Sequence, residues 1–135
     1  MPLIRLEHVQ FIDKSQAFRA RDLGIKLSMQ PNFTADSVDY SDRLPVGYPA
    51  ANNPFRMLID QAGFCPGQDL LFGSDGMPHG IAYAAQWSLF PPFDGQRLTL
   101  DELIAGYGPS RGKSGNFVLE VDDREKSVRI LDTAR

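Results

Sequence analysis

Three short β-prone segments alternate with segments that favour helices, and this alternation is the strongest constraint on the fold. The β-prone segments cover residues 3–9, 25–30 and 70–72, and helix-forming or turn-forming residues follow each of them. Strands that alternate with helices pair in parallel, because a crossover connection returns the chain to the same end of the sheet. The sequence therefore predicts an α/β fold built on a parallel sheet.

Two of the predicted helices begin with a capping box. In this motif a side chain at the cap and another three residues later bind backbone N–H groups that have no partner inside the helix. The pairs are Asp13 with Gln16, before a helix predicted for 14–23, and Thr99 with Glu102, before a helix predicted for 100–107. Asn53 before Pro54 predicts a third start, for a helix over 54–62, and a fourth helix is expected within 81–89.

The segment from 31 to 53 shows neither a helical nor a strand period. It is rich in Asn, Asp, Ser, Pro and Gly, so we expect a long loop there. A loop of that length inside a compact domain is usually functional or disordered. Near the C-terminus, two β-rich runs separated by charged residues predict a β-hairpin over 116–132.

The length of 135 residues suits one domain, so we expect a single domain over 1–135, with the βα region at 3–108 and the hairpin at 116–132. The net charge of −3 gives no reason to expect nucleic acid or a membrane surface as a partner. No apolar run has the length of a membrane span, and the N-terminal residues lack the pattern of a signal peptide. Cys65 is the only cysteine, which excludes an intrachain disulfide and favours a cytoplasmic location.

Polar residues follow each of the three predicted strands. His8, Gln30 and Asp75 close the first, second and third strands. The carboxyl ends of parallel strands meet at one rim, where functional groups of α/β proteins gather, so we expect these three side chains to lie together. Taken singly, each residue also has a structural interpretation. Asp75 is a typical cap, and His8 is an ordinary strand-end residue. Gln30 with Pro31 can end a strand as readily as it can contact a ligand.

The motifs around these residues resemble a known family. "RLEHVQ" at 5–10, "GIKLSMQP" at 24–31 and "LLFGSDGMP" at 70–78 look like the last three βα units of the amidohydrolase superfamily. The most similar branch is the group of metal-dependent hydrolases called amidohydrolase family 3, and "LTLDELIAGYG" at 98–108 resembles the helix after its eighth strand. The resemblance implies a partial (β/α)8 TIM barrel, with strands equivalent to six, seven and eight, followed by the hairpin.

The resemblance also implies an activity. Members of the family hydrolyse C–N bonds of amides or cyclic amides with a metal-activated water. By resemblance, His8 is a metal ligand or polarises the substrate carbonyl, Asp75 is both a metal ligand and the general base, and Gln30 contacts the small-molecule substrate. The implied cofactor is a divalent metal, most typically zinc, which lowers the pKa of its bound water.

The other metal ligands of the family have no counterpart here. The sequence holds two histidines, His8 and His79, and no His-x-His pair, so the resemblance describes a truncated chain. Three hypotheses follow. The missing ligands come from a complementing N-terminal barrel fragment; or the domain is non-catalytic and self-associates or binds a small molecule; or His8, Asp75 and His79 hold one metal in a homo-oligomer. Self-association is expected because three strands leave the edges of the sheet exposed.

Overall fold

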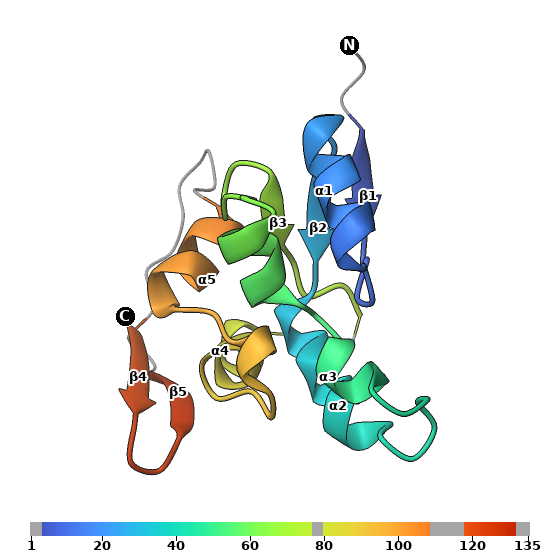
Figure 1. The fold of residues 1–135 in the computed structure, drawn as a ribbon. Helices are drawn as coiled ribbons and strands as arrows, with labels where there is room; N and C mark the ends of the chain where they lie inside the picture. The colour runs from blue at the N-terminus through green and yellow to red at the C-terminus, as the bar shows by residue number, and fades with distance from the viewer. Residues whose placement is uncertain (1–3, 77–79, 109–117, 132–135) are drawn as a thin grey trace.

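A computed structural model describes residues 4–76, 80–108 and 118–131. Three parallel strands form a sheet in the order β1 (Arg5–Glu7), β2 (Lys26–Met29) and β3 (Leu70–Phe72), as Figure 1 shows. The predicted parallel sheet is therefore present, and its strands follow one another in chain order.

The prediction of a partial TIM barrel is wrong. β1 and β3 are the edges of an open sheet, and no barrel closes within the described ranges. A closed barrel needs about eight strands tilted around one axis, and three strands cannot complete that curvature. The two sheet faces also differ, because Leu27 is fully buried whereas its neighbour Ser28 is only half-buried.

The first crossover is the helix α1 (Lys14–Asp22), which lies against the sheet in Figure 1. Its capping box is present as predicted: Asp13 Oδ1 accepts from the Gln16 backbone N–H at 2.8 Å, and Gln16 Oε1 accepts from the Asp13 N–H at 3.0 Å. Ala17 and Ala20 form its buried side. Small side chains there let the helix approach the strands closely.

The prediction of a loop over 31–53 is wrong for much of that segment. It contains the 3-10 helix η1 (Pro31–Ala35) and the short helices α2 (Asp36–Asp39) and α3 (Tyr48–Ala51). Hydrogen bonds from distant side chains support these turns; for example, Asn52 Nδ2 donates to the Phe33 carbonyl at 2.9 Å. Such bonds leave no hydrophobic period in the sequence, so the pattern could not reveal them.

The later helices occur close to their predicted positions. The predicted helix over 54–62 contains a π-helical turn rather than regular α-helix throughout, and the capping box of the last helix is present. The elements are η2 (Met57–Gln61), α4 (Ile81–Leu89), the 3-10 helix η3 (Asp94–Gln96) and α5 (Leu100–Tyr107). None of the helices in the described ranges has an apolar stretch long enough to cross a bilayer.

The predicted hairpin is present as β4 (Val118–Asp122) and β5 (Ser127–Leu131), which pair antiparallel; the outermost predicted residues lie outside the described ranges. It does not extend the parallel sheet but packs on α4. Gln86 makes the junction: its Nε2 donates to the Lys126 carbonyl at 2.7 Å, and its Oε1 accepts from the Val128 N–H at 2.8 Å.

The core lies between the sheet and the helices. α5 packs on β3 so closely that a Cβ atom added at Gly106 would overlap the ring of Phe72. That ring is also in edge contact with Phe55 and Tyr107. The buried apolar cluster consists of Ala17, Ala20, Leu27, Met29, Phe55, Leu58, Ala62, Phe64, Leu70, Phe72, Ala85, Leu98 and Leu103.

Candidate functional site

The structure brings all three predicted site residues together. His8 Nδ1 lies 3.0 Å from Gln30 Oε1 and 3.9 Å from Asp75 Oδ2. His8 follows β1, Gln30 follows β2, and Asp75 lies beyond β3. The rule that parallel strands present their carboxyl ends at one rim therefore predicted the cluster correctly.

The backbone at two of these residues is strained. His8 has a φ of 69° and Asp75 a φ of 50°, which is the left-handed region that side chains with a Cβ rarely adopt. At His8 the Val9 N–H also bonds to the Glu7 carbonyl at 3.0 Å, which closes a tight γ-turn of the rare positive-φ kind. Such conformations cost about 1–3 kcal/mol each and gather at functional sites.

Two neighbours fix the orientation of the His8 ring. The ring of Phe33 in η1 is parallel to it within 3°, with the centroids 6.2 Å apart. Gln30 is buried, and its backbone carbonyl accepts from Asn53 Nδ2 at 2.9 Å. This bond holds in place the residue whose side chain contacts His8 Nδ1. Because an amide oxygen can only accept, this contact is a hydrogen bond when the ring carries a proton on Nδ1, which leaves Nε2 of the neutral ring as an acceptor.

The carboxylate and the imidazole are accessible to solvent. The side chains of His8 and Asp75 are 51% and 54% exposed, so water weakens their mutual attraction. The arrangement therefore offers a hydrogen-bond donor or acceptor on the ring and a carboxylate able to accept a proton.

The segment that carries Asp75 is anchored by η1. Asn32 Nδ2 in η1 donates to the Ser74 carbonyl at 3.0 Å. Burial raises the pKa of the Tyr107 phenol in α5, and the nearby Ser74 partly opposes that rise. Ser74 therefore lies between η1, which holds it, and the buried end of α5.

A polar layer beneath the site was not predicted from the sequence. Gln10 Nε2 donates to Asp36 Oδ2 at 3.0 Å and to Asn52 Oδ1 at 3.1 Å. Burial raises the pKa of the Asp36 carboxyl, against the opposing effect of the hydrogen bond from Gln10. Asn53, expected only as a helix cap, instead donates its side-chain amide to the Gln30 carbonyl and to Thr34 Oγ1. The adjacent asparagines and Gln10 were the signal, but nothing in the sequence indicated their partners.

The described residues do not complete a metal centre. Nowhere in 4–76, 80–108 and 118–131 do three or more His, Cys, Asp or Glu side chains gather around a position for a metal ion. His8 and Asp75 make one pair, whereas a catalytic zinc normally has three protein ligands, and His8 Nδ1 already faces Gln30. His79, the third predicted candidate, lies outside the described residues.

Comparison with known proteins found no protein-family model, no curated protein and no solved structure that matches the chain significantly.

Proposed function

We propose that the chain is a hydrolase of the amidohydrolase lineage that acts on the C–N bond of a small amide or cyclic amide. The observation that carries the proposal is the meeting of His8, Gln30 and Asp75 from three separate strand ends, with strained backbone at two of them. Residues held in unfavourable conformations around an accessible cluster are typical of working groups.

The geometry suits two roles at the scissile carbonyl. Asp75 is an exposed carboxylate that accepts a proton from the attacking water, as a general base does, and returns it to the leaving nitrogen as the C–N bond breaks. In its imidazolium form His8 donates both N–H groups, Nδ1 to Gln30 and Nε2 to the carbonyl oxygen where negative charge develops. Gln30 keeps the ring in place for that contact. At this site the described residues supply two metal-type donors, His8 and Asp75, which do not suffice to hold a metal-bound water.

The test is turnover of a panel of linear and cyclic amides, which is measured by the release of amine or ammonia. The protein is purified without chelator and assayed with and without added zinc. We expect Asp75→Asn and His8→Asn to lower the rate at least about 100-fold, because general acid–base groups contribute on that scale. Asp123→Asn, in the exposed hairpin turn, is the matched control and should keep the wild-type rate. Absence of turnover under all conditions, or an undiminished rate in Asp75→Asn, would rule the proposal out.

A second candidate function is binding without chemistry. It is favoured by the small number of metal-type donors at the rim, two within the described ranges, and by the parallel rings of His8 and Phe33 beside these polar groups. In this case small amides should shift the NMR signals of His8 and Gln30 without being consumed, and Phe33→Ala should weaken that binding. Unchanged signals at millimolar amide would eliminate this candidate.

A further inference from the structure

The outer edge of β1 pairs with no other strand in the part of the chain that the structure describes, so it can accept one. On its inner side the His8 N–H bonds to the Ser28 carbonyl at 2.8 Å, and the Ile4 carbonyl accepts from the Lys26 N–H at 3.0 Å. Backbone groups of successive strand residues point to alternate sides. The amides and carbonyls of Arg5 and Glu7 therefore point away from β2, toward the edge. The Glu7 carbonyl already accepts from the Val9 N–H at 3.0 Å and keeps a second lone pair for a partner strand.

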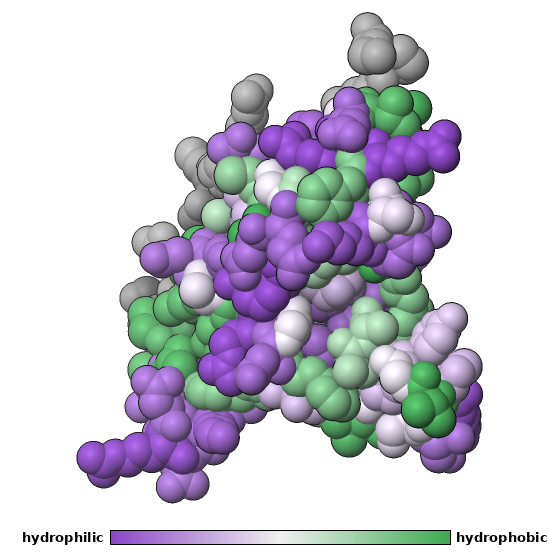
Figure 2. Space-filling view, viewed as in Figure 1, coloured by the Kyte–Doolittle hydropathy of each residue, from purple (hydrophilic) through white to green (hydrophobic). Residues whose placement is uncertain are grey.

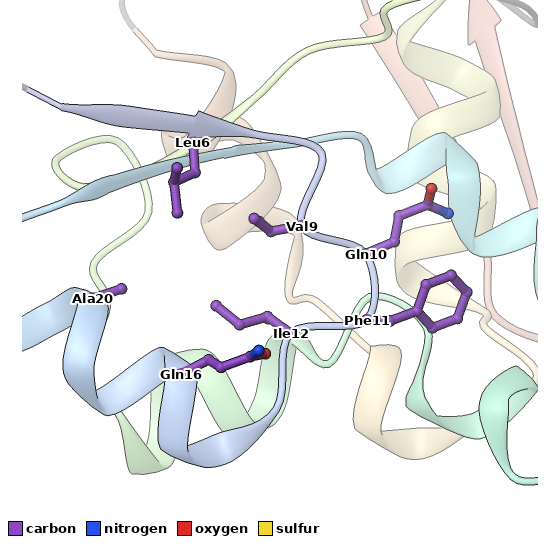
Figure 3. Close-up of a pocket in the computed structure, with 7 residues that line it drawn as sticks. All are labelled: Leu6, Val9, Gln10, Phe11, Ile12, Gln16 and Ala20. Atoms are coloured by element: carbon purple, nitrogen blue, oxygen red, sulfur yellow. The ribbon is translucent and has the colours of Figure 1, made fainter.

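An apolar groove runs beside this edge. A cavity of about 370 Å³ opens between β1 and α1, and Leu6, Val9 and Ala20 line it from both sides. Figure 3 shows Leu6 pointing from β1 toward α1, with Val9 and Ile12 directed into the same space. Aliphatic side chains of this kind gain stability when a partner removes them from water.

Two further exposed side chains extend the apolar strip. Ile4 shares the strand face of Leu6 because it lies two residues before it, and it is 50% exposed. Leu23 is three residues after Ala20 and so lies on the same flank of the helix; it is 54% exposed. Figure 2 shows a few green, apolar atoms among purple, hydrophilic ones at the end of the molecule where Figure 1 has β1. A patch formed by a strand edge and its covering helix is typical of an interaction site.

The charges on β1 indicate what pairs with it. Arg5 and Glu7 lie on the same face, form an ion pair with each other, and flank Leu6. On the inner side Arg5 is opposite Lys26, a residue of the same charge. A strand that ran antiparallel past this edge with Leu6 opposite Leu6 would put a glutamate opposite Arg5 and an arginine opposite Glu7. The segment is thus complementary to itself in that register.

We propose that the occupant of this edge is a second copy of the chain, paired antiparallel through β1 about a two-fold axis at Leu6. Arg5 then faces Glu7 of the partner subunit, and these two residues exchange two backbone hydrogen bonds. The equivalent pair, Glu7 with Arg5 of the partner subunit, does the same. The two Leu6 side chains lie next to each other on the α1 face and cover the mouths of both grooves. A closed two-fold interface of this kind leaves neither β1 edge free.

Exchange of the two charges tests the proposal directly. Arg5→Glu makes two glutamates face each other in both pairs, and Glu7→Arg makes two arginines face each other. We expect each single variant to raise the dissociation constant of the dimer about tenfold or more, since attraction becomes repulsion at two positions. The double variant Arg5→Glu with Glu7→Arg restores opposite charges and should return the dissociation constant to within about threefold of the wild type. The measurement is sedimentation velocity at about 1–100 µM, with circular dichroism to show that every variant is folded.

Mixing the two single variants separates this interface from any other. Equimolar Arg5→Glu and Glu7→Arg proteins should form a heterodimer, because each glutamate of one variant then faces an arginine of the other. Wild-type protein that stays monomeric over the whole concentration range would overturn the proposal. A dimer that both single variants keep unchanged would also overturn it, because the contact would then lie elsewhere.

Discussion

His8 Nδ1 lies 3.9 Å from Asp75 Oδ2, although the two residues follow the two edge strands of the sheet and are separated by the strand between them. His8 directly follows β1, Asp75 lies three residues beyond the end of β3, and both have left-handed backbone conformations. Gln30, at the end of the central strand, lies between the edges and contacts His8. The rim is therefore a cluster assembled from all three strands rather than a local motif.

The contact between Gln30 and His8 predicts a tautomer. In wild-type protein the neutral His8 ring should carry its proton on Nδ1, which long-range proton–nitrogen NMR correlation can detect. Gln30→Leu removes the acceptor at 3.0 Å and should shift the ring toward a mixture of tautomers. Gln61→Leu, at an exposed position, is the control. An identical nitrogen spectrum in Gln30→Leu would show that Gln30 does not orient the ring.

Close packing between α5 and β3 predicts a large cost for one methyl group. Gly106→Ala forces the new Cβ into the ring of Phe72, so we expect a loss of about 1–3 kcal/mol in the free energy of unfolding. Gly95→Ala adds the same group in open space and should change stability little. Urea unfolding followed by circular dichroism measures both. Equal stability of the two variants would contradict the packing.

The raised pKa of the Asp36 carboxyl predicts that the free energy of unfolding depends on pH. Burial raises the pKa of its carboxyl in the folded protein above the usual 3.8, so the folded state holds the proton more tightly than the unfolded chain. Folding is then favoured at low pH, and this contribution is lost as the pH rises through the raised value. Asp36→Asn should therefore gain stability relative to wild type as the pH rises from about 3.8, and the gain should level off at higher pH. A pH-independent difference between the two proteins would disprove this effect.

The lowered pKa of the Glu102 carboxyl predicts the opposite dependence of the free energy of unfolding on pH. Although burial raises the pKa of its carboxyl, hydrogen bonds from the Thr99 backbone and from Arg56 at 2.7 Å lower it below 4.5 overall. Its stabilising effect is therefore present above pH 4.5 and is lost as the pH falls through the lowered value.

Thermal unfolding of Glu102→Gln across this pH range provides the check. At neutral pH the variant should lose about 0.5–1 kcal/mol, as expected for a partly exposed ion pair. In acid the loss should disappear. Glu125→Gln, in the exposed hairpin turn, is the control. A loss that persists unchanged in acid would mean that the charge of Glu102 does not contribute.

Much of the secondary structure could be predicted because it depends on neighbours in the sequence. The capping boxes at Asp13 and Thr99 each join residues three positions apart, and both were found. The meeting of His8, Gln30 and Asp75 was also predictable, since it follows from parallel pairing alone. The positive φ values of His8 and Asp75 were not, because neither residue is a glycine and only surrounding structure can hold such strain.

The sequence by itself determined the alternation of strands and helices, the parallel direction of the sheet and the edge at which polar residues gather. Only the tertiary structure decided that the sheet stays open, that helical turns occupy much of 31–53, and that Asn53 holds Gln30 instead of simply capping a helix. The physical reason is the range of the forces involved. Capping and hydrophobic period act between residues a few positions apart, whereas sheet closure and buried polar contacts depend on groups that only folding brings together.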